Sequence, residues 1–145
     1  MAIGDGGGGG GPVGFANSFT GPATAIEISG DHAYCYTGNH GADTTAVEAM
    51  KFTTGNYYFV GTLQANMGSQ NADTGTSTSI TVAQFELNGS VISHIHAGNT
   101  GADSLTSVRQ PIIIPAYTEV VVKLYSNEDA PDRFMTATLT GRIYR

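Results

Sequence analysis

The amino-acid sequence predicts an all-β protein, an antiparallel jelly-roll sandwich of eight to nine strands that follows a flexible glycine-rich arm. Turn-rich segments recur at intervals of about thirty residues, which is room for two strands and one tight turn. Between these turns, apolar and polar residues alternate with the period of two that a half-buried strand requires. Apolar residues at helical spacing with capping residues are missing, so almost no helix is expected.

Three of the turn segments have nearly the same sequence: GNHGADT at 38–44, GSQNADT at 68–74 and GNTGADS at 98–104. Glycine allows a positive φ, and Asn and Asp side chains bond to the backbone two residues further on. These oxygens could also bind calcium, but each segment holds a single carboxylate, and turn formation explains the residues better. In a jelly roll, four loops share one end of the sandwich, and we expect them at 38–45, 68–76, 98–106 and 127–133.

The expected strands, in chain order, are 24–29, 31–37, 46–53, 56–67, 77–87, 91–97, 105–114, 118–126 and 134–144. The third has some helical propensity but must pair as a strand to keep the thirty-residue spacing. In the fourth, the side chains of Phe59 and Leu63 share one face and those of Tyr58 and Gln64 share the other.

The later strands follow the same logic. The fifth breaks phase after Val82, so we expect a β-bulge near 83–84. Asn88-Gly89 is a strong signal for a two-residue hairpin. Pro111 and Pro115 restrict the seventh strand to an edge of its sheet or to an irregular form. The last two strands alternate regularly, and an immunoglobulin-like sandwich is the alternative architecture, without the Trp and Cys pair of a true immunoglobulin domain.

Composition limits the possible functions. The 145 residues are expected to form one domain, 23–145, after an arm at 1–22. The net charge of -6 disfavours nucleic-acid binding, and no apolar run is long enough to span a membrane. Cys35 is the only cysteine, so no internal disulfide is expected, and the first residues do not resemble a secretory signal. Only 12% of residues are charged, which fits either subunit interfaces or a threonine-rich β-protein.

The first 22 residues contain six consecutive glycines, from Gly6 to Gly11, followed by Pro12. Such a segment forms neither a helix nor a strand by itself, because glycine loses the most backbone entropy on ordering. It is either a disordered tail or an arm that orders against a partner. Phe15 and Phe19 favour the arm, since solvent-exposed linkers seldom carry aromatic side chains.

The sequence holds few candidates for chemistry. His94 and His96 lie two residues apart, so in a strand they share one face and could ligate a metal, as in cupins. The carboxylate and further histidine that cupins use do not follow in the sequence, so we expect these residues to be packed or at a subunit contact. Cys35 is expected to be a buried hydrophobe, and no nucleophile motif is present. Tyrosines in the strands are candidate sugar-stacking platforms. We expect no enzymatic activity and no cofactor.

The segments 110–124 and 138–144 resemble the C-terminal half of small jelly-roll decoration (cement) proteins of tailed bacteriophages. Segments 55–61 and 85–92 are more loosely similar to C1q/TNF-like trimers. The resemblance implies a homotrimer, made in the host cytoplasm, that binds the outer surface of the virion capsid and cements neighbouring major capsid proteins. Its arm would contact the capsid through Gly6, Gly11, Pro12, Phe15 and Phe19. The alternatives are a receptor- or glycan-binding head of a phage fibre or tail, and a cupin-like metalloenzyme.

Overall fold

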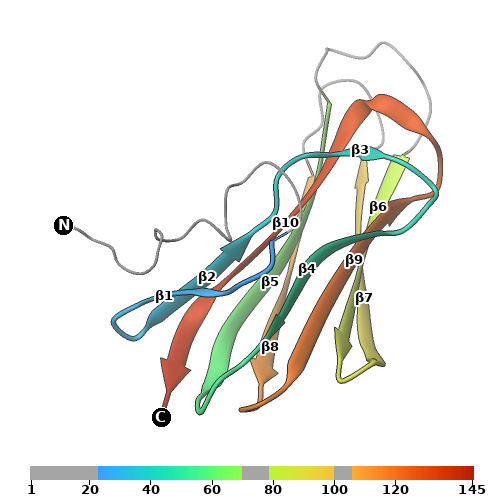
Figure 1. The fold of residues 1–145 in the computed structure, drawn as a ribbon. Coiled ribbons are helices and arrows are strands. Elements are labelled where there is room, and N and C mark those ends of the chain that lie inside the picture. Colours follow the sequence, from blue (N-terminus) through green and yellow to red (C-terminus); the bar gives the residue numbers. More distant parts are fainter. Residues whose placement is uncertain (1–22, 70–78, 100–105) are drawn as a thin grey trace.

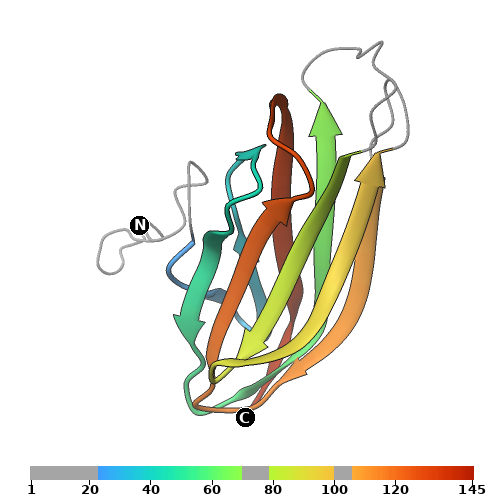
Figure 2. The same ribbon diagram turned by 90° about the vertical axis from the view of Figure 1, so that its right-hand side faces the viewer.

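The computed structural model describes residues 23–69, 79–99 and 106–145, and within these ranges the chain forms ten strands and no helix. The strands make two antiparallel sheets that pack face to face, as Figure 2 shows, so the prediction of an all-β sandwich is confirmed. The arm at 1–22 and most of the predicted loops at 68–76 and 98–106 lie outside the described residues.

The first sheet has the order β1-β2-β10-β5-β8, and β3 also pairs with β10 (Figure 1). Its strands are β1 (Glu27–Ser29), β2 (His32–Tyr36), β3 (His40–Ala42), β5 (Tyr58–Ser69), β8 (Thr106–Ile114) and β10 (Ala130–Tyr144). The second sheet has the order β4-β9-β6-β7. Its strands are β4 (Val47–Thr53), β6 (Ser79–Leu87), β7 (Ser90–Asn99) and β9 (Glu119–Ser126). The chain therefore crosses repeatedly from one sheet to the other.

The core lies between the two sheets and is built by the alternation seen in the sequence. Phe59, Leu63 and Leu139 are fully buried on the first sheet, and Phe85 and Val122 face them from the second. The predicted division of faces in β5, β9 and β10 is confirmed by this burial. Pro111 lies on β8, an edge strand, as predicted, because proline cannot donate a ladder hydrogen bond to a second neighbour.

The end of the sandwich predicted to carry the loops is where β5 and β7 end and where β6, β8 and β10 begin (Figure 1). One element there was not predicted, because His40, Gly41 and Ala42 form the short strand β3 inside the expected loop 38–45. The cause is the length of β10, which has 15 residues and extends beyond β2. Between the part of β10 that pairs with β2 and the part that pairs with β3, Thr37 makes two hydrogen bonds to Ala137. Its N–H donates to the Ala137 carbonyl at 3.0 Å, and its Oγ1 accepts from the Ala137 N–H at 2.9 Å.

The bulge predicted near Ala83 is not there. β6 pairs with β9 without interruption, and Ala83 lies opposite Leu124 on the core side while Val82 lies opposite Tyr125 on the outside. Val82 is nevertheless buried. The irregularity is instead between Phe85 and Glu86 in the pairing with β7, where Ile92 is the extra residue. The prediction failed because Val82, an apolar residue that faces outward, was taken for a residue of the core.

The turns at the other end follow their residue types. Asn88 and Gly89 both have positive φ, 49° and 80°, as the predicted two-residue hairpin requires. The Asn88 side-chain oxygen also accepts a hydrogen bond from the Glu119 N–H at 2.9 Å, which ties the hairpin to β9. Thr54 is buried and links two connections, since its Oγ1 donates to the Pro115 carbonyl at 2.7 Å.

Two glycines set the distance between β5 and β10. Gly61 and Gly141 are register partners, and the Phe59 ring lies over both. A Cβ on Gly61 would stand 2.5 Å from the Phe59 ring and even closer to the Thr140 carbonyl. No side chain fits there. The two glycines therefore allow β5 and β10 to remain paired beneath the Phe59 ring.

We therefore expect Gly61→Ala to lower the free energy of unfolding by about 1–3 kcal/mol, because the added methyl group overpacks the contact with Phe59 and Thr140. Urea denaturation of the full chain measures this change. Gly41→Ala is the matched control, since a Cβ there meets nothing within 4 Å. Equal stabilities of the two variants would contradict the close packing.

Candidate functional site

The outward surfaces of the two sheets differ in chemistry. We call the outward surface of β2, β10, β5 and β8 the tyrosine face, because it carries Tyr34, Tyr36, Tyr58 and Tyr144. We call the outward surface of β4, β9, β6 and β7 the charged face. On β2, β5 and β10 the tyrosines alternate with buried residues, which places them on the outside of the sheet.

The tyrosine face is poor in charge. Among the outward positions of β5 (58–66), β8 (107–113) and β10 (134–144), the charged residues are Arg109 and Arg142, and there is no carboxylate or lysine. Threonine, glutamine and asparagine occupy the centre. Depletion of Lys, Glu and Asp together with enrichment of Tyr and Arg is the composition that distinguishes protein interfaces from ordinary surface.

Polar side chains at the centre of the tyrosine face form a hydrogen-bonded ladder across three strands. Arg109 Nε on β8 donates to Gln64 Oε1 at 2.9 Å, and Gln64 Nε2 donates to Asn66 Oδ1 at 2.8 Å. Asn66 Nδ2 continues the ladder to Thr136 Oγ1 on β10 at 2.9 Å, and Ser107 Oγ donates to Asn66 Oδ1 at 2.7 Å. These bonds hold the side chains in one arrangement, so this part of the surface is preorganised for contact.

Apolar side chains gather at the hairpin end of the same face. The rings of Tyr58 and Tyr144 stack with centroids 5.5 Å apart, and Ile113, which lies opposite Val60, is 64% exposed. Tyr117, in the turn that follows β8, is 68% exposed. Single exposed apolar residues are ordinary, but a contiguous group of this kind is typical of an interaction site.

The other margin of the tyrosine face, over β2 and β10, is hollowed. An open depression of about 410 Å³ is lined by His32, Ala33, Tyr34, Tyr36, Thr140, Gly141 and Arg142. The rings of Tyr34 and Tyr36 have centroids 5.0 Å apart and are tilted by 38°. Asp31 stands at its margin, with Oδ2 3.4 Å from Arg142 Nη1 and Oδ1 2.9 Å from His32 Nδ1.

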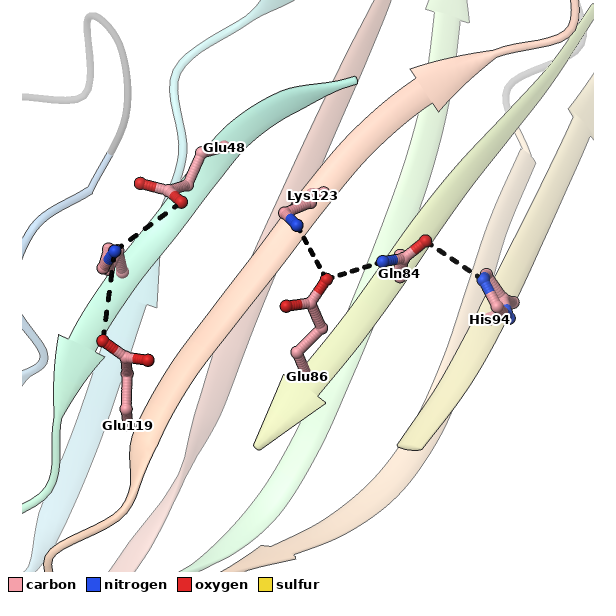
Figure 3. Close-up of polar contacts among 7 residues, drawn as sticks. Glu48, Gln84, Glu86, His94, Glu119 and Lys123 are labelled. Carbon is pink, nitrogen blue, oxygen red and sulfur yellow. Dashed lines mark hydrogen bonds and ion pairs between the residues drawn. The ribbon is translucent and has the colours of Figure 1, made fainter. Parts of the chain in front are cut away.

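The charged face is occupied by a connected polar network, shown in Figure 3. Lys123 Nζ lies 2.9 Å from Glu86 Oε1, which also accepts from Gln84 Nε2 at 2.6 Å. Gln84 Oε1 in turn lies 3.2 Å from His94 Nε2. The hydrogen bond from Lys123, followed by that from Gln84, lowers the pKa of Glu86, and the same contact raises the pKa of Lys123.

The predicted site residues fall in different places. His94 and His96 do share one face, the charged face, where both are exposed. His32 and His40 belong to the other sheet, and within the described residues no three His, Cys, Asp or Glu side chains are grouped to hold a metal. Cys35 is buried, as predicted; burial and then the charge of Glu27 raise the pKa of its thiol to about 12, so it is protonated at neutral pH.

The first turn motif forms a turn only in part: the Thr45 N–H donates to Asp43 Oδ1 at 2.7 Å, whereas His40, Gly41 and Ala42 pair as β3. The fourth loop, which lacks the motif, is bonded to its neighbours. Asn127 Oδ1 accepts from the Ile80 N–H at 2.7 Å, and Asp129 Oδ1 accepts from the Thr44 N–H at 2.8 Å. These acceptors join the fourth loop to β6 and to the segment before β4.

Sequence reasoning missed the polar ladder and the depression. Alternation did place Tyr58, Gln64 and Asn66 on one face of β5. It could not supply the register that brings Arg109 opposite Gln64 or Thr140 opposite Tyr34, because these partners are far apart in the chain.

The contact of Glu86 with Lys123 makes a pH prediction. Because the folded protein lowers the pKa of Glu86 from 4.5, the contact stabilises the fold above that pH and the stabilisation is lost as pH falls through the lower, folded pKa. Glu86→Gln should therefore lower the Tm at pH 7 and have a much smaller effect near pH 3. Glu48→Gln is the control, since Glu48 is exposed and its nearest cation, Lys51, is 3.9 Å away. An equal Glu86→Gln effect at both pH values would contradict the assignment.

The part of the chain that the structure describes contains no helix long and apolar enough to cross a membrane. No model of a known protein family matches the sequence, and comparison with curated proteins finds none similar to it. Any assignment of function therefore depends on the two outer faces and their geometry.

Proposed function

We propose that the protein is a structural protein of a phage virion, which forms a homotrimer and binds the outer surface of the capsid to cement neighbouring major capsid proteins. The observation that carries this proposal is the contrast between the two outer faces. One is charged and internally paired, and the other has the composition of an interface.

The subunit contact is assigned to the β5–β8 side of the tyrosine face, around Tyr58, Tyr144 and Ile113. These side chains are exposed and apolar, so their burial in a trimer would contribute favourably, at about 25 cal/mol per Å² of apolar surface. The neighbouring ladder from Arg109 to Thr136 is already ordered, which reduces the entropy lost on association. His94 and His96, which the sequence led us to expect as packed or at a subunit contact, lie on the opposite face and are not part of the contact proposed here.

The strand orders support the same proposal. We read β2-β10-β5-β8 and β4-β9-β6-β7 as the two sheets of a jelly roll, the architecture of the decoration proteins that the sequence resembles. A closed sandwich of this kind offers a rigid support, and cementing requires no catalytic group.

The arm is the proposed capsid contact. Residue Ala23, where the described chain begins, is bonded to the edge of β4: its N–H donates to the Ala49 carbonyl at 2.8 Å, and its carbonyl accepts from the Lys51 N–H at 2.9 Å. An arm that starts from this anchored residue could reach a neighbouring protein, and its ordering cost would be offset by the surface that it covers.

The oligomer is tested by sedimentation velocity of Ile113→Glu, which places a charge in the proposed contact. We expect the trimer to dissociate, with a loss of about 2 kcal/mol or more per interface. Ile92→Glu is the matched control, because Ile92 is 54% exposed but lies on β7. A wild-type chain that is monomeric, or an Ile113→Glu variant that stays trimeric, would contradict the proposed contact.

The arm is tested by deleting residues 1–22. The truncated chain should keep its fold and oligomeric state but lose occupancy on capsids, measured by co-sedimentation and by mass spectrometry of particles. Undiminished occupancy would refute the role of the arm. Many copies per particle, in a fixed ratio to the major capsid protein, support decoration, whereas a few copies would favour the fibre or tail head.

A further inference from the structure

We infer that the depression over β2 and β10 is a binding site for a neutral hexopyranose sugar. The depression holds about 410 Å³, within the range of roughly 300–1,000 Å³ that small-molecule sites occupy. Ala33 and Gly141, which are register partners, line it without a bulky side chain, so the surrounding side chains stand above a low floor.

One wall is aromatic. Tyr34 and Tyr36 are half-buried neighbours on the outward side of β2, and their rings lie against each other, which restricts their rotation. A tyrosine ring offers an apolar face with a polar tip, and a pyranose likewise has an apolar face of C–H groups and a polar rim. The wall therefore matches one face of a sugar ring and leaves its hydroxyl groups pointing to the opposite side.

The opposite wall supplies both donors and acceptors. The Arg142 guanidinium donates, and the Thr140 hydroxyl can donate or accept. Asp31, which stands at the margin beside Arg142, adds a carboxylate acceptor. Asp31 and Arg142 are paired at 3.4 Å, yet their side chains are 60% and 55% exposed, so atoms of both remain accessible to a ligand. A carboxylate has about four lone-pair sites, and the contacts to Arg142 and His32 leave room for sugar hydroxyl groups.

The backbone fixes this acceptor in place. Gly30 has a positive φ of 65°, which turns the chain between β1 and β2, and the Asp31 carbonyl accepts from the Ile143 N–H at 2.9 Å. Asp31 is thus tied to β10 beside Arg142. The Asp31 carboxylate itself is positioned by its contacts with Arg142 and His32.

The charge balance selects a neutral ligand. The charges of Asp31 and Arg142 cancel, so the site has no excess cation to attract an acidic sugar. A sugar carboxylate near Arg142 would also approach the Asp31 carboxylate, and this repulsion disfavours it. A ligand with several hydroxyl groups and no net charge suits the site better.

The sugar site borders the proposed subunit contact on β10, where Arg142 and Tyr144 share the outward side, but its aromatic wall on β2 lies apart from that contact. β10 and β5 lie between β2 and β8, so the two tyrosines of the depression are three strands away from the strand of Ile113. The inference does not depend on the proposed trimer or on the capsid, and the two are tested by different measurements.

The test is an NMR titration of the full-length ¹⁵N-labelled protein with the methyl glycosides of glucose, galactose and mannose, to tens of millimolar. We expect at least one glycoside to shift amide signals of residues 32–36 and 138–142. N-acetylneuraminic acid, an acidic sugar, should bind at least roughly tenfold more weakly. Binding of the acidic sugar with equal strength would overturn the neutral class.

Two variants locate the site. Tyr34→Ala and Arg142→Gln should each weaken the binding by roughly tenfold, which corresponds to about 1.4 kcal/mol. Tyr125→Ala and Lys51→Gln are matched controls, since Tyr125 is on the charged face and Lys51 is an exposed cation on β4 of the same sheet. Either test variant is sufficient if the other fails to fold. Absence of shifts with all three glycosides, shifts confined to other residues, or binding unaffected by both test variants would overturn the inference.

Discussion

The close pairing of β10 with β5 is the constraint on which both outer faces depend. Gly61 and Gly141 meet in this ladder beneath the Phe59 ring, and there is no space for a side chain at either position. Because the ladder continues through Tyr144 opposite Tyr58, it also sets the stacking of these two rings. On its other edge β10 pairs with β2, which opens the depression between Tyr34 and Arg142. One long strand therefore positions the apolar contact, the polar ladder and the proposed sugar site.

The two outer faces are built on strands of the same kind but differ in which side chains they expose. On the charged face, Glu86 and Lys123 satisfy each other and Gln84 extends the network to His94, so the surface is largely paired within the chain. On the tyrosine face, amides and hydroxyl groups take the place of charges at the centre, and Tyr58, Tyr144 and Ile113 leave large parts of their side chains exposed. A surface of the first kind suits solvent, and one of the second kind suits contact with a protein or a sugar.

Local pattern was sufficient wherever a feature depends on neighbours in the chain. The alternation in 118–126 and 134–144 predicted which side chains enter the core, and Asn88-Gly89 predicted its hairpin. It was insufficient wherever distant strands meet. The bulge near 83–84 was predicted wrongly because Val82, an apolar residue, was taken for a core residue. It faces outward between Tyr125 and His96, and these neighbours belong to other strands, so the local sequence does not reveal them. The Arg109–Gln64 contact and the depression likewise require a register between segments far apart in sequence, which no local pattern contains.

The central claim is that the tyrosine face, on its β5–β8 side, contacts another copy of the chain. Hydroxyl-radical footprinting, with side-chain oxidation measured by mass spectrometry at dilute and concentrated protein, tests it most directly. The account predicts that Tyr58, Tyr144 and Ile113 become protected as the oligomer forms, while Tyr125 on the charged face keeps its reactivity. Protection of Tyr125 and His94 with unchanged oxidation of Tyr58 and Tyr144 would contradict it.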